Sequence, residues 1–411
     1  MNRPHLLWIK ADPLHPLNTG GKIRTYNMMV ELKKQYEITF FTLGSQPSSN
    51  EAELYSDHQH WVDWTDSKSN KLQFLMSFAR NCFFSSLPFV IDRYTTDTIT
   101  EELRKVLTSE QFDFVVCDFL SLSGNLTQLP RLSNAPHVVF QHNVESRIWE
   151  RHTENASNFA TGFVFKKQWQ RYLKYEKQAC EWFDGVIAVS EDDSKAFREE
   201  FGLTNVLGDV PTGVNVTQFQ EFPRQPKPGS LVFLGSMDWM PNIDGICDFV
   251  EQTYPLIREK QPEASLTIVG RNPPDKVVNF AKSDSSITVT GTVDDVRPYL
   301  ASGAVSIVPL RIGGGTRIKI FEAMAANMPV VSTTIGAEGL PVTDGLDIYI
   351  ADSAEEFANK TCSLLGDSDH ARDMAQKGFE LVRDNFGWNR VTDKFIEMLE
   401  SLLKNREPIG S

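Results

Sequence analysis

Short runs of apolar and β-branched residues alternate along this chain with stretches of helical periodicity. Runs of this kind are typical of strands that are buried on both faces of a parallel sheet. Alternation of such strands with helices predicts an α/β fold in which helices cover both faces of the sheet. In the first half of the chain we expect strands at residues 6–10, 37–43, 112–118, 137–141 and 185–189.

The pattern changes near residues 210–215, where Pro211 and Gly213 interrupt it, and a polar, proline-rich stretch follows at 222–229. Such a stretch is typical of a connection between domains, so we place a domain junction here. A second alternating series begins after it. Its expected strands lie at residues 230–234, 265–269, 287–290, 304–309, 330–333 and 347–350, with a helix around 246–260.

Two domains are also what the length of 411 residues predicts, because one hydrophobic core rarely serves so long a chain. We assign residues 1–210 and 211–388 to two Rossmann-like, doubly wound domains, and residues 389–411 to a C-terminal helix with an apolar stripe. Ligands of doubly wound sheets bind outside the carboxyl ends of the strands. Two such domains that face each other would present both sets of strand ends to one central cleft.

Residues 304–334, AVSIVPLRIGGGTRIKIFEAMAANMPVVSTT, predict a strand, a glycine loop, a helix and a second strand. A glycine loop that feeds a helix N-terminus exposes backbone N–H groups and favours anions. Arg317 and Lys319 add two positive charges, and the carboxylate of Glu322 can accept hydrogen bonds from sugar hydroxyls. The segment therefore indicates recognition of phosphate together with hydroxyl groups. The candidate loop residues are Gly313, Gly314, Gly315 and Thr316.

Other interpretations of this loop are weaker. In an ordinary strand-to-helix turn the glycines would serve packing alone, but two cations and an acid close to them favour binding. A dinucleotide-binding loop fits poorly because Ile318 stands where its third glycine belongs. The chain has no G-x-x-x-x-G-K-[ST] sequence, which disfavours a P-loop ATPase.

Glu322-Ala323-Met324-Ala325 and Pro329-Val330-Val331 resemble the second half of the donor-binding motif of the retaining GT-B glycosyltransferases of family 4. The first glutamate of that motif falls on Gly314, and GGGTR-x-K is similar to a subgroup common in bacterial polysaccharide clusters. The resemblance implies two Rossmann-like domains that face a cleft. Residues 1–210 would be the acceptor side and 211–388 the nucleotide-sugar side, with the C-terminal helix packing back on the first domain.

The resemblance also implies the chemistry. The expected activity is that of a retaining glycosyltransferase, most simply a hexosyltransferase, with a nucleoside diphosphate sugar as donor substrate and no cofactor. Glu322 would hold the nucleotide ribose, and the acceptor would be a glycan, a lipid-linked molecule or another hydroxyl compound. Two alternatives stay open: a GT-B-like sugar-nucleotide epimerase, and a non-catalytic nucleotide-sugar-binding subunit, which the missing glutamate at Gly314 suggests.

The first half carries two candidate groups at strand ends. Gly20 and Gly21 precede a helix and resemble the N-terminal glycine loop of the family, near the donor phosphate and the acceptor; a simple loop is the equal alternative. His142 follows an expected strand, and the resemblance implies that it lies near the donor sugar, at its 6-position hydroxyl. Capping of the next helix is the alternative for His142. Glu145 is a weaker candidate for contact with the acceptor.

In the second half, Ser236 and Asn242 stand in a loop where many family members have an arginine and a lysine. We expect Arg317 and Lys319 to neutralise the diphosphate instead, with help from the loop amides. The family binds its nucleotide base near the segment at residues 291–295. Val293 and Asp295 are therefore the candidates for contact with the base.

Composition narrows the classes of partner and site. A formal net charge of −13 disfavours bulk binding to nucleic acid. Five cysteines without a C-x-x-C pair disfavour a disulfide scaffold or a structural zinc site and favour the reducing cytoplasm. Asp367-Ser-Asp369 matches the D-x-D of metal-dependent glycosyltransferases, but it falls between two expected helices. We interpret it as a turn and predict no metal.

Residues 163–178 are basic and aromatic, with Phe165, Trp169, Tyr172 and Leu173 on one helical face. We favour a core-facing helix with a solvated rim, and contact with an anionic membrane or a lipid-linked acceptor is the alternative. No run of about 18 apolar residues occurs, so no transmembrane helix is predicted. We expect a cytoplasmic protein, for which any peripheral membrane contact would be at the inner face of the membrane.

Overall fold

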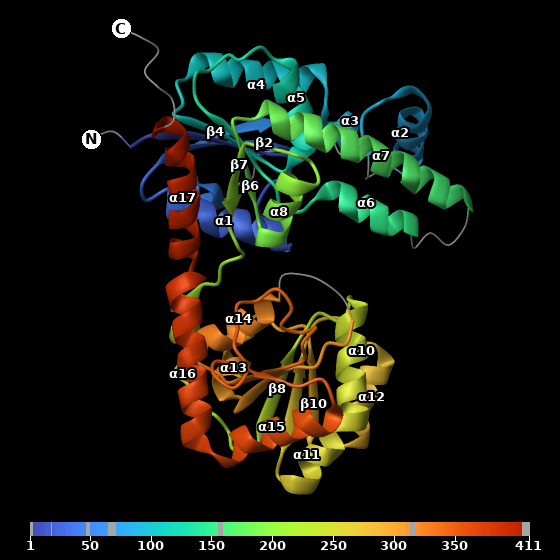
Figure 1. The fold of residues 1–411 in the computed structure, drawn as a ribbon, viewed down its shortest axis with the longest axis vertical. Helices are drawn as coiled ribbons and strands as arrows, with labels where there is room; N and C mark the ends of the chain where they lie inside the picture. The colour runs from blue at the N-terminus through green and yellow to red at the C-terminus, as the bar shows by residue number, and fades with distance from the viewer. Residues whose placement is uncertain are drawn as a thin grey trace. The chain divides into compact units, whose positions relative to one another are not determined.

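The computed structural model describes residues 3–17, 19–46, 50–64, 71–154, 159–312 and 317–404. The chain divides into two compact units. The first comprises Met1–Pro211 with Val391–Ser411, and the second comprises Thr212–Arg390. In each unit, helices cover both faces of one parallel sheet (Figure 1). This is the doubly wound α/β architecture that the alternating pattern predicts.

The first sheet has seven strands in the described residues, in the order β3-β2-β1-β4-β5-β6-β7, and every pair is parallel. All five predicted strands are present. The structure adds β3 and β7, the two edges of the sheet, where exposed positions dilute the apolar signal. The strands are β1 (His5–Lys10), β2 (Glu37–Leu43), β3 (His58–Val62), β4 (Phe114–Asp118), β5 (His137–Phe140), β6 (Gly185–Ala188) and β7 (Val206–Asp209).

Side-chain caps fix where several helices of the first unit begin. Thr19 accepts a hydrogen bond from the backbone of Lys22, and Ser190 accepts one from the backbone of Asp193, as expected for a capping box variant. The helices are α1 (Gly20–Leu32), α2 (Lys71–Phe84), α3 (Phe89–Tyr94), α4 (Asp97–Ser109), α5 (Ser123–Gln128), α6 (Glu145–Glu154), α7 (Phe159–Trp182) and α8 (Glu191–Glu199).

The second sheet has six parallel strands in the described residues, in the order β10-β9-β8-β11-β12-β13. All six were expected. They are β8 (Ser230–Leu234), β9 (Ser265–Val269), β10 (Ile287–Gly291), β11 (Val305–Val308), β12 (Val330–Ser332) and β13 (Tyr349–Ile350). The main helices are α10 (Met240–Asp248), α11 (Tyr254–Lys260), α12 (Asp275–Ser283), α13 (Arg297–Ser302), α14 (Ile318–Ala325), α15 (Ala354–Gly366) and α16 (Ser368–Asn385).

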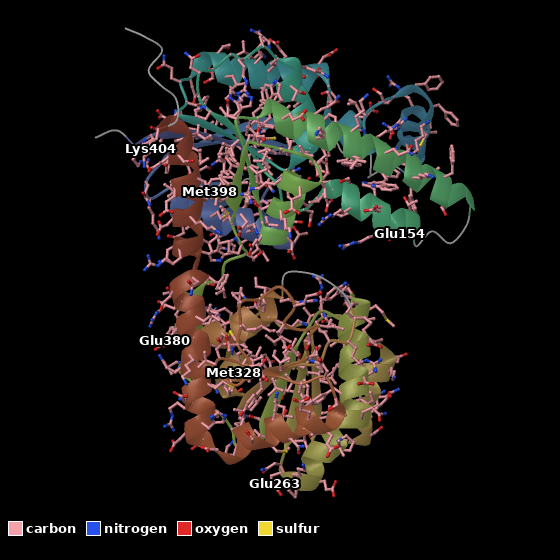
Figure 2. The ribbon with its side chains drawn as sticks, viewed as in Figure 1. Glu154, Glu263, Met328, Glu380, Met398 and Lys404 are labelled. Carbon is pink, nitrogen blue, oxygen red and sulfur yellow. The ribbon has the colours of Figure 1, made fainter. Side chains whose placement is uncertain are left out.

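The last helix, α17 (Trp388–Lys404), contributes its residues from Val391 onward to the first unit. The ring of Phe395 packs against Trp8 and Phe140, with ring centroids 5.7 and 5.4 Å apart. Met398, labelled in Figure 2, fills the space beside Gly208 of β7. The apolar stripe of this helix therefore completes the core of the first domain.

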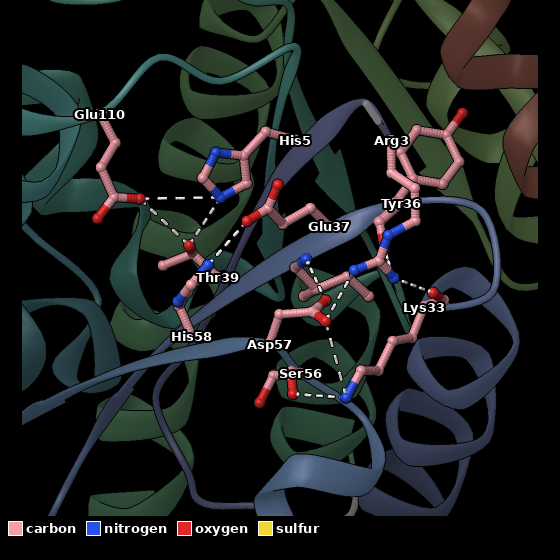
Figure 3. A network of polar contacts seen from close by, with 11 residues as sticks. Arg3, His5, Lys33, Tyr36, Glu37, Thr39, Ser56, Asp57, His58 and Glu110 are labelled. Atoms are coloured by element: carbon pink, nitrogen blue, oxygen red, sulfur yellow. Dashed lines mark hydrogen bonds and ion pairs between the residues drawn. The ribbon is translucent and has the colours of Figure 1, made fainter. Parts of the chain in front are cut away.

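A polar network ties the strands of the first sheet together where they begin (Figure 3). Asp57 accepts hydrogen bonds from Arg3 and from the backbone of Ile38, both at 2.9 Å, and Lys33 donates to the carbonyl of Ser56. This network lies at the amino ends of β1, β2 and β3. Since ligands of such sheets bind at the carboxyl ends, we give it a structural role.

Candidate functional site

The carboxyl ends of the second sheet open into a cavity of about 620 Å³. Its walls come from the loops after β8, β9, β10 and β11 and from the first turn of α14. The cavity therefore lies where a doubly wound sheet is expected to bind its ligand. Of the residues predicted from the sequence, it brings together Ser236, Asn242, Val293, Arg317, Lys319 and Glu322.

Arg317 stands immediately before α14 in a left-handed conformation, with φ of 50°. Such a conformation is uncommon for a residue other than glycine and often marks a functional position. Only 5% of Arg317 is exposed, and its Nη2 atom lies 3.2 Å from the carboxylate of Glu338. The turn thus holds a buried guanidinium at the cavity wall. The predicted glycine loop, with Gly313, Gly314, Gly315 and Thr316, lies outside the described residues.

Lys319 and Glu322 share the wall formed by α14. The Nζ atom of Lys319 donates to Oδ1 of Asn242 at 2.6 Å and lies 5.0 Å from the ring centroid of Phe233. Burial lowers the pKa of Lys319 to about 8, and Glu322 acts in the opposite direction. Removal from bulk water raises the pKa of Glu322 to about 7. An anion that enters the cavity would favour the charged form of Lys319 and the protonated form of Glu322.

The loops after β8 and β9 approach each other closely. A Cβ atom on Gly270 would lie 1.8 Å from the carbonyl oxygen of Gly235, so this contact requires glycine. Arg271 follows and also lines the cavity, where it pairs with Asp238 at 2.6 Å. Sequence reasoning missed Arg271, although a glycine and an arginine directly after a predicted strand were an available signal.

Two sequence predictions fall elsewhere in the second unit. Asp295 does not line the cavity, because its carboxylate binds the guanidinium of Arg297, 2.8 Å away. Asp367 caps α16 by accepting from the backbones of Asp369 and His370, so the D-x-D sequence forms the expected turn. Within the described ranges, no group of three or more histidine, cysteine, aspartate or glutamate side chains is arranged to hold a metal.

The carboxyl ends of the first sheet contain a buried network centred on Asp118, the last residue of β4. Its Oδ2 atom accepts from Trp8 at 3.1 Å, Lys10 at 2.9 Å and Thr25 at 2.6 Å. Its Oδ1 atom lies 2.9 Å from Nε2 of His142. Burial alone would raise the pKa of Asp118, but Lys10 and His142 outweigh it and hold that pKa well below its usual range. The carboxylate therefore stays charged.

Two aromatic rings and the carboxylate of Asp118 contact the ring of His142. Its ring lies between Phe119 and Phe140, with centroids 4.0 and 4.7 Å away. Burial lowers the pKa of His142 to about 4, although Asp118 acts in the opposite direction, so the ring is neutral at pH 7. Since Nε2 faces a carboxylate, it carries the proton, and Nδ1 is an acceptor. Nδ1 faces Gly21 and has no hydrogen-bond partner in the part of the chain that the structure describes.

Phe119, which packs on His142, also lines a smaller cavity of about 220 Å³. Its polar walls are Asp12, Ser121, Glu145 and Tyr172. Burial raises the pKa of Glu145 to about 7. Phe119, also in the wall, has φ of 67° and ψ of 165°, a conformation that is essentially restricted to glycine and costs about 1–3 kcal/mol. Gly20 begins α1 in open space, with nothing near the position of a Cβ atom.

Comparison with known proteins places both halves in related families. Residues 19–218 match the family described as Glycosyltransferase Family 4, and residues 228–367 match Glycosyl transferases group 1. A 44.6 kDa protein in the cps region of Klebsiella pneumoniae is 21% identical over 94% of this chain and 97% of its own length.

Solved structures share the fold. Sucrose-phosphate synthase from Thermosynechococcus elongatus has a TM-score of 0.67 at 16% identity and covers 98% of this chain and 100% of its own. Anabaena HepE in complex with UDP and glucose has a TM-score of 0.61 at 12% identity over 96% of this chain and 99% of its own. The two family matches, the two parallel-sheet domains and the similarity to solved structures all indicate the same family and fold. The chain belongs to the group 1, family 4 glycosyltransferases and is a sugar-transferring enzyme of the GT-B fold.

Proposed function

We propose that this enzyme transfers a sugar from a nucleoside diphosphate sugar to a hydroxyl group of a glycan or lipid-linked acceptor, with retention at the anomeric carbon. The observation that carries the proposal is the convergence of Arg317, Lys319 and Glu322 in one cavity at the strand ends of the second domain. Two cations beside a carboxylate match the two parts of the donor, its diphosphate and its ribose hydroxyls.

The main catalytic need is stabilisation of the charge that grows on the departing diphosphate. Arg317 and Lys319 are held before the reaction by Glu338 and Asn242, so little reorganisation is required. The N-terminus of α14 adds its dipole in the same place. Lys319 has a pKa lowered by burial, and an arriving diphosphate dianion would raise it and fix the positive charge.

Glu322 is the only carboxylate among the described residues that line this cavity. We assign it to the ribose hydroxyls. Because that assignment leaves no carboxylate nucleophile on the cavity wall, we infer attack by the acceptor on the same face as the departing diphosphate, which takes the acceptor proton. His142 offers Nδ1 to a sugar hydroxyl. The smaller cavity, with Glu145, is our candidate for the acceptor, because carboxyl and hydroxyl groups suit hydroxyl-bearing rings.

We also infer that the enzyme works in the cytoplasm and without a bound metal. All five cysteines are free thiols, which suits a reducing compartment. A lipid-linked acceptor would bring it to the inner membrane surface. None of the helices in the described ranges combines the length and apolarity needed to cross a bilayer. Unchanged transfer after treatment with EDTA is the expected result for a metal-independent enzyme, and loss of transfer would contradict it.

The deciding experiment compares UDP, GDP, ADP and dTDP by thermal shift, and then the matching nucleotide sugars by turnover. We expect one nucleotide to raise the melting temperature clearly, since saturation at 100 times the dissociation constant adds about 2.7 kcal/mol. Its sugar derivative should release nucleoside diphosphate in the presence of acceptor. Epimerised donor without acceptor, or binding without turnover on any acceptor pool, would contradict the proposal.

A further inference from the structure

Two helices of the first domain expose large apolar side chains to water. In α2, Phe83 is 80% and Phe84 86% exposed, and Met76 is 65% exposed. In α7, Phe163 is 63% exposed. Single exposed apolar residues are common on soluble proteins, but clustered aromatic ones usually mark an interaction site. None of these four residues lines either of the two cavities described above.

The outward face of α7 has a regular composition. The opposite side of this helix is covered by α6, where Trp149 packs on Phe165 and Tyr172 at 6.0 and 5.8 Å. The sequence prediction that Leu173 shares this covered face is wrong, because Leu173 is 47% exposed. At helical spacing the exposed positions form one stripe. Its members are Phe163, Lys166, Gln170, Leu173 and Lys174.

The two helices are fastened to each other. Arg171 and Gln168 of α7 both donate to Oδ1 of Asn81 in α2, at 2.8 and 2.9 Å, and Lys167 donates to the carbonyl of Cys82. These bonds hold the end of α2 against α7, and Phe83 and Phe84 directly follow the two bonded residues of α2. Figure 1 shows α2 and α7 as neighbouring helices of the first unit. The exposed side chains of both helices therefore belong to one fixed surface.

The charge of this surface is opposite to that of the whole protein. Among the described side chains of α2 and of residues 161–174 in α7, the exposed ionisable ones are all basic, in a chain of net charge −13: Arg80, Lys166 and Lys174. Basic side chains near the membrane surface are attracted to anionic lipid head groups. Apolar and basic side chains in this combination are typical of helices that lie in the membrane interface.

We propose that this surface of α2 and α7 docks on an anionic lipid bilayer. Phe83 and Phe84 enter the boundary between head groups and acyl chains, and Lys166 and Lys174 meet the lipid phosphates. Lipid suits this surface better than a protein partner does, because its exposed ionisable side chains are all basic and match the phosphates of an anionic bilayer. Docking would also keep the first domain close to an acceptor carried on a lipid.

The experiment is sedimentation of the full-length protein with vesicles of phosphatidylcholine alone and of phosphatidylcholine with phosphatidylglycerol. We expect binding to the second kind only, weakening as salt is added because the attraction is screened. The double variant Phe83→Ser/Phe84→Ser should lower the partition coefficient at least about 10-fold, since two exposed aromatic side chains lose their transfer into the interface. Lys166→Glu/Lys174→Glu should lower it to a similar extent.

The control is Leu54→Ser, which removes an exposed apolar side chain, 59% exposed, from outside this surface in the same domain. It should bind vesicles as the unmodified protein does. Unchanged nucleotide binding and circular dichroism show that each variant is folded. Equal binding to both vesicle compositions, absence of binding at low salt, or unchanged binding of the double phenylalanine variant would each overturn the proposal. None of these readouts depends on sugar transfer.

Discussion

The two domains repeat one architecture but treat charge differently where their strands end. In the first domain, the Asp118 carboxylate is surrounded by Trp8, Lys10, Thr25 and His142, so its charge is matched within the protein. In the second domain, Lys319 donates to the neutral amide of Asn242, at the wall of a cavity of about 620 Å³. Internally matched charges position a side chain, whereas a cation bonded to a neutral amide at a cavity wall, as Lys319 is, remains available to an incoming anion.

The largest effect is expected from Asp118→Asn, which tests whether the charge in the first domain is matched. Loss of the carboxylate leaves Lys10 buried without its counter-charge, which we expect to lower the free energy of unfolding by about 3–5 kcal/mol. Urea denaturation of the full chain measures it. The control is Glu101→Gln, which breaks an exposed ion pair with Arg104 and should leave the free energy of unfolding nearly unchanged. Similar losses in the two variants would show that the network is not a matched buried charge.

The next test concerns the second domain. Arg317→Ala should weaken nucleoside diphosphate binding about 100-fold, since a charge-assisted hydrogen bond in a buried site is lost, and leave nucleoside binding nearly unchanged. Isothermal titration measures both ligands. Arg311→Ala is the control, because Arg311 is half-exposed, pairs with Asp244 at 2.9 Å and does not line the cavity. Equal losses for nucleotide and nucleoside would contradict the phosphate assignment.

A third test uses pH. The folded pKa of Glu145, about 7, lies above its usual 4.5, so its protonated form stabilises the fold, and that stability is lost as pH rises through 7. Glu145→Gln stays neutral. Relative to the unmodified protein, its free energy of unfolding should rise by about 2–3 kcal/mol between pH 5 and pH 8. Urea denaturation at the two values measures this.

The control for the pH test is Glu154→Gln, at the exposed far end of the same helix (Figure 2). Because its side chain is solvated, we expect the difference from the unmodified protein to be the same at both pH values. If Glu145→Gln behaves like this control, Glu145 is not shielded from water in the way the small cavity requires.

The smallest expected effect on stability comes from Gly21→Ala. The added Cβ atom would lie 3.5 Å from Phe119 and 3.6 Å from Nδ1 of His142, ordinary contact distances, so stability should change by less than about 1 kcal/mol. The methyl group nevertheless covers the free acceptor atom of His142. We expect kcat/KM to fall about 10-fold or more if a sugar hydroxyl binds Nδ1. Gly20→Ala, next to it in open space, should leave kcat/KM unchanged.

Local pattern was enough to predict the interior strands, because each is a continuous apolar run. It failed for β3, HQHWV, and β7, VLGD, since polar residues and Gly208 break the run at the edges of the sheet. It also predicted one helix around residues 246–260. The structure has α10 and α11 joined by a π-helical segment, Phe249–Thr253, just before Pro255.

The candidate site was predictable where its residues are neighbours in sequence, as for Arg317, Lys319 and Glu322 on one helix turn. Three partners of Asp118, namely Trp8, Lys10 and Thr25, come from positions 93 to 110 residues away, and no spacing in the sequence joins them to it. Asp295 was predicted to contact the base, but its carboxylate instead accepts a hydrogen bond from Arg297, only two residues further along the chain. Both residues are evident in the sequence, but the hydrogen bond between their side chains is not.

The placement of α17 bears on how this protein is made. The rings of Trp8 and Phe140 pack against Phe395, so the first domain lacks part of its interior until the ribosome has passed the second domain and added α17. The second domain, Thr212–Arg390, is one continuous segment, so its residues are all synthesised before α17 is complete. Synthesis therefore completes the later domain before the earlier one, and a stalled or truncated product would display a tryptophan that the finished enzyme hides.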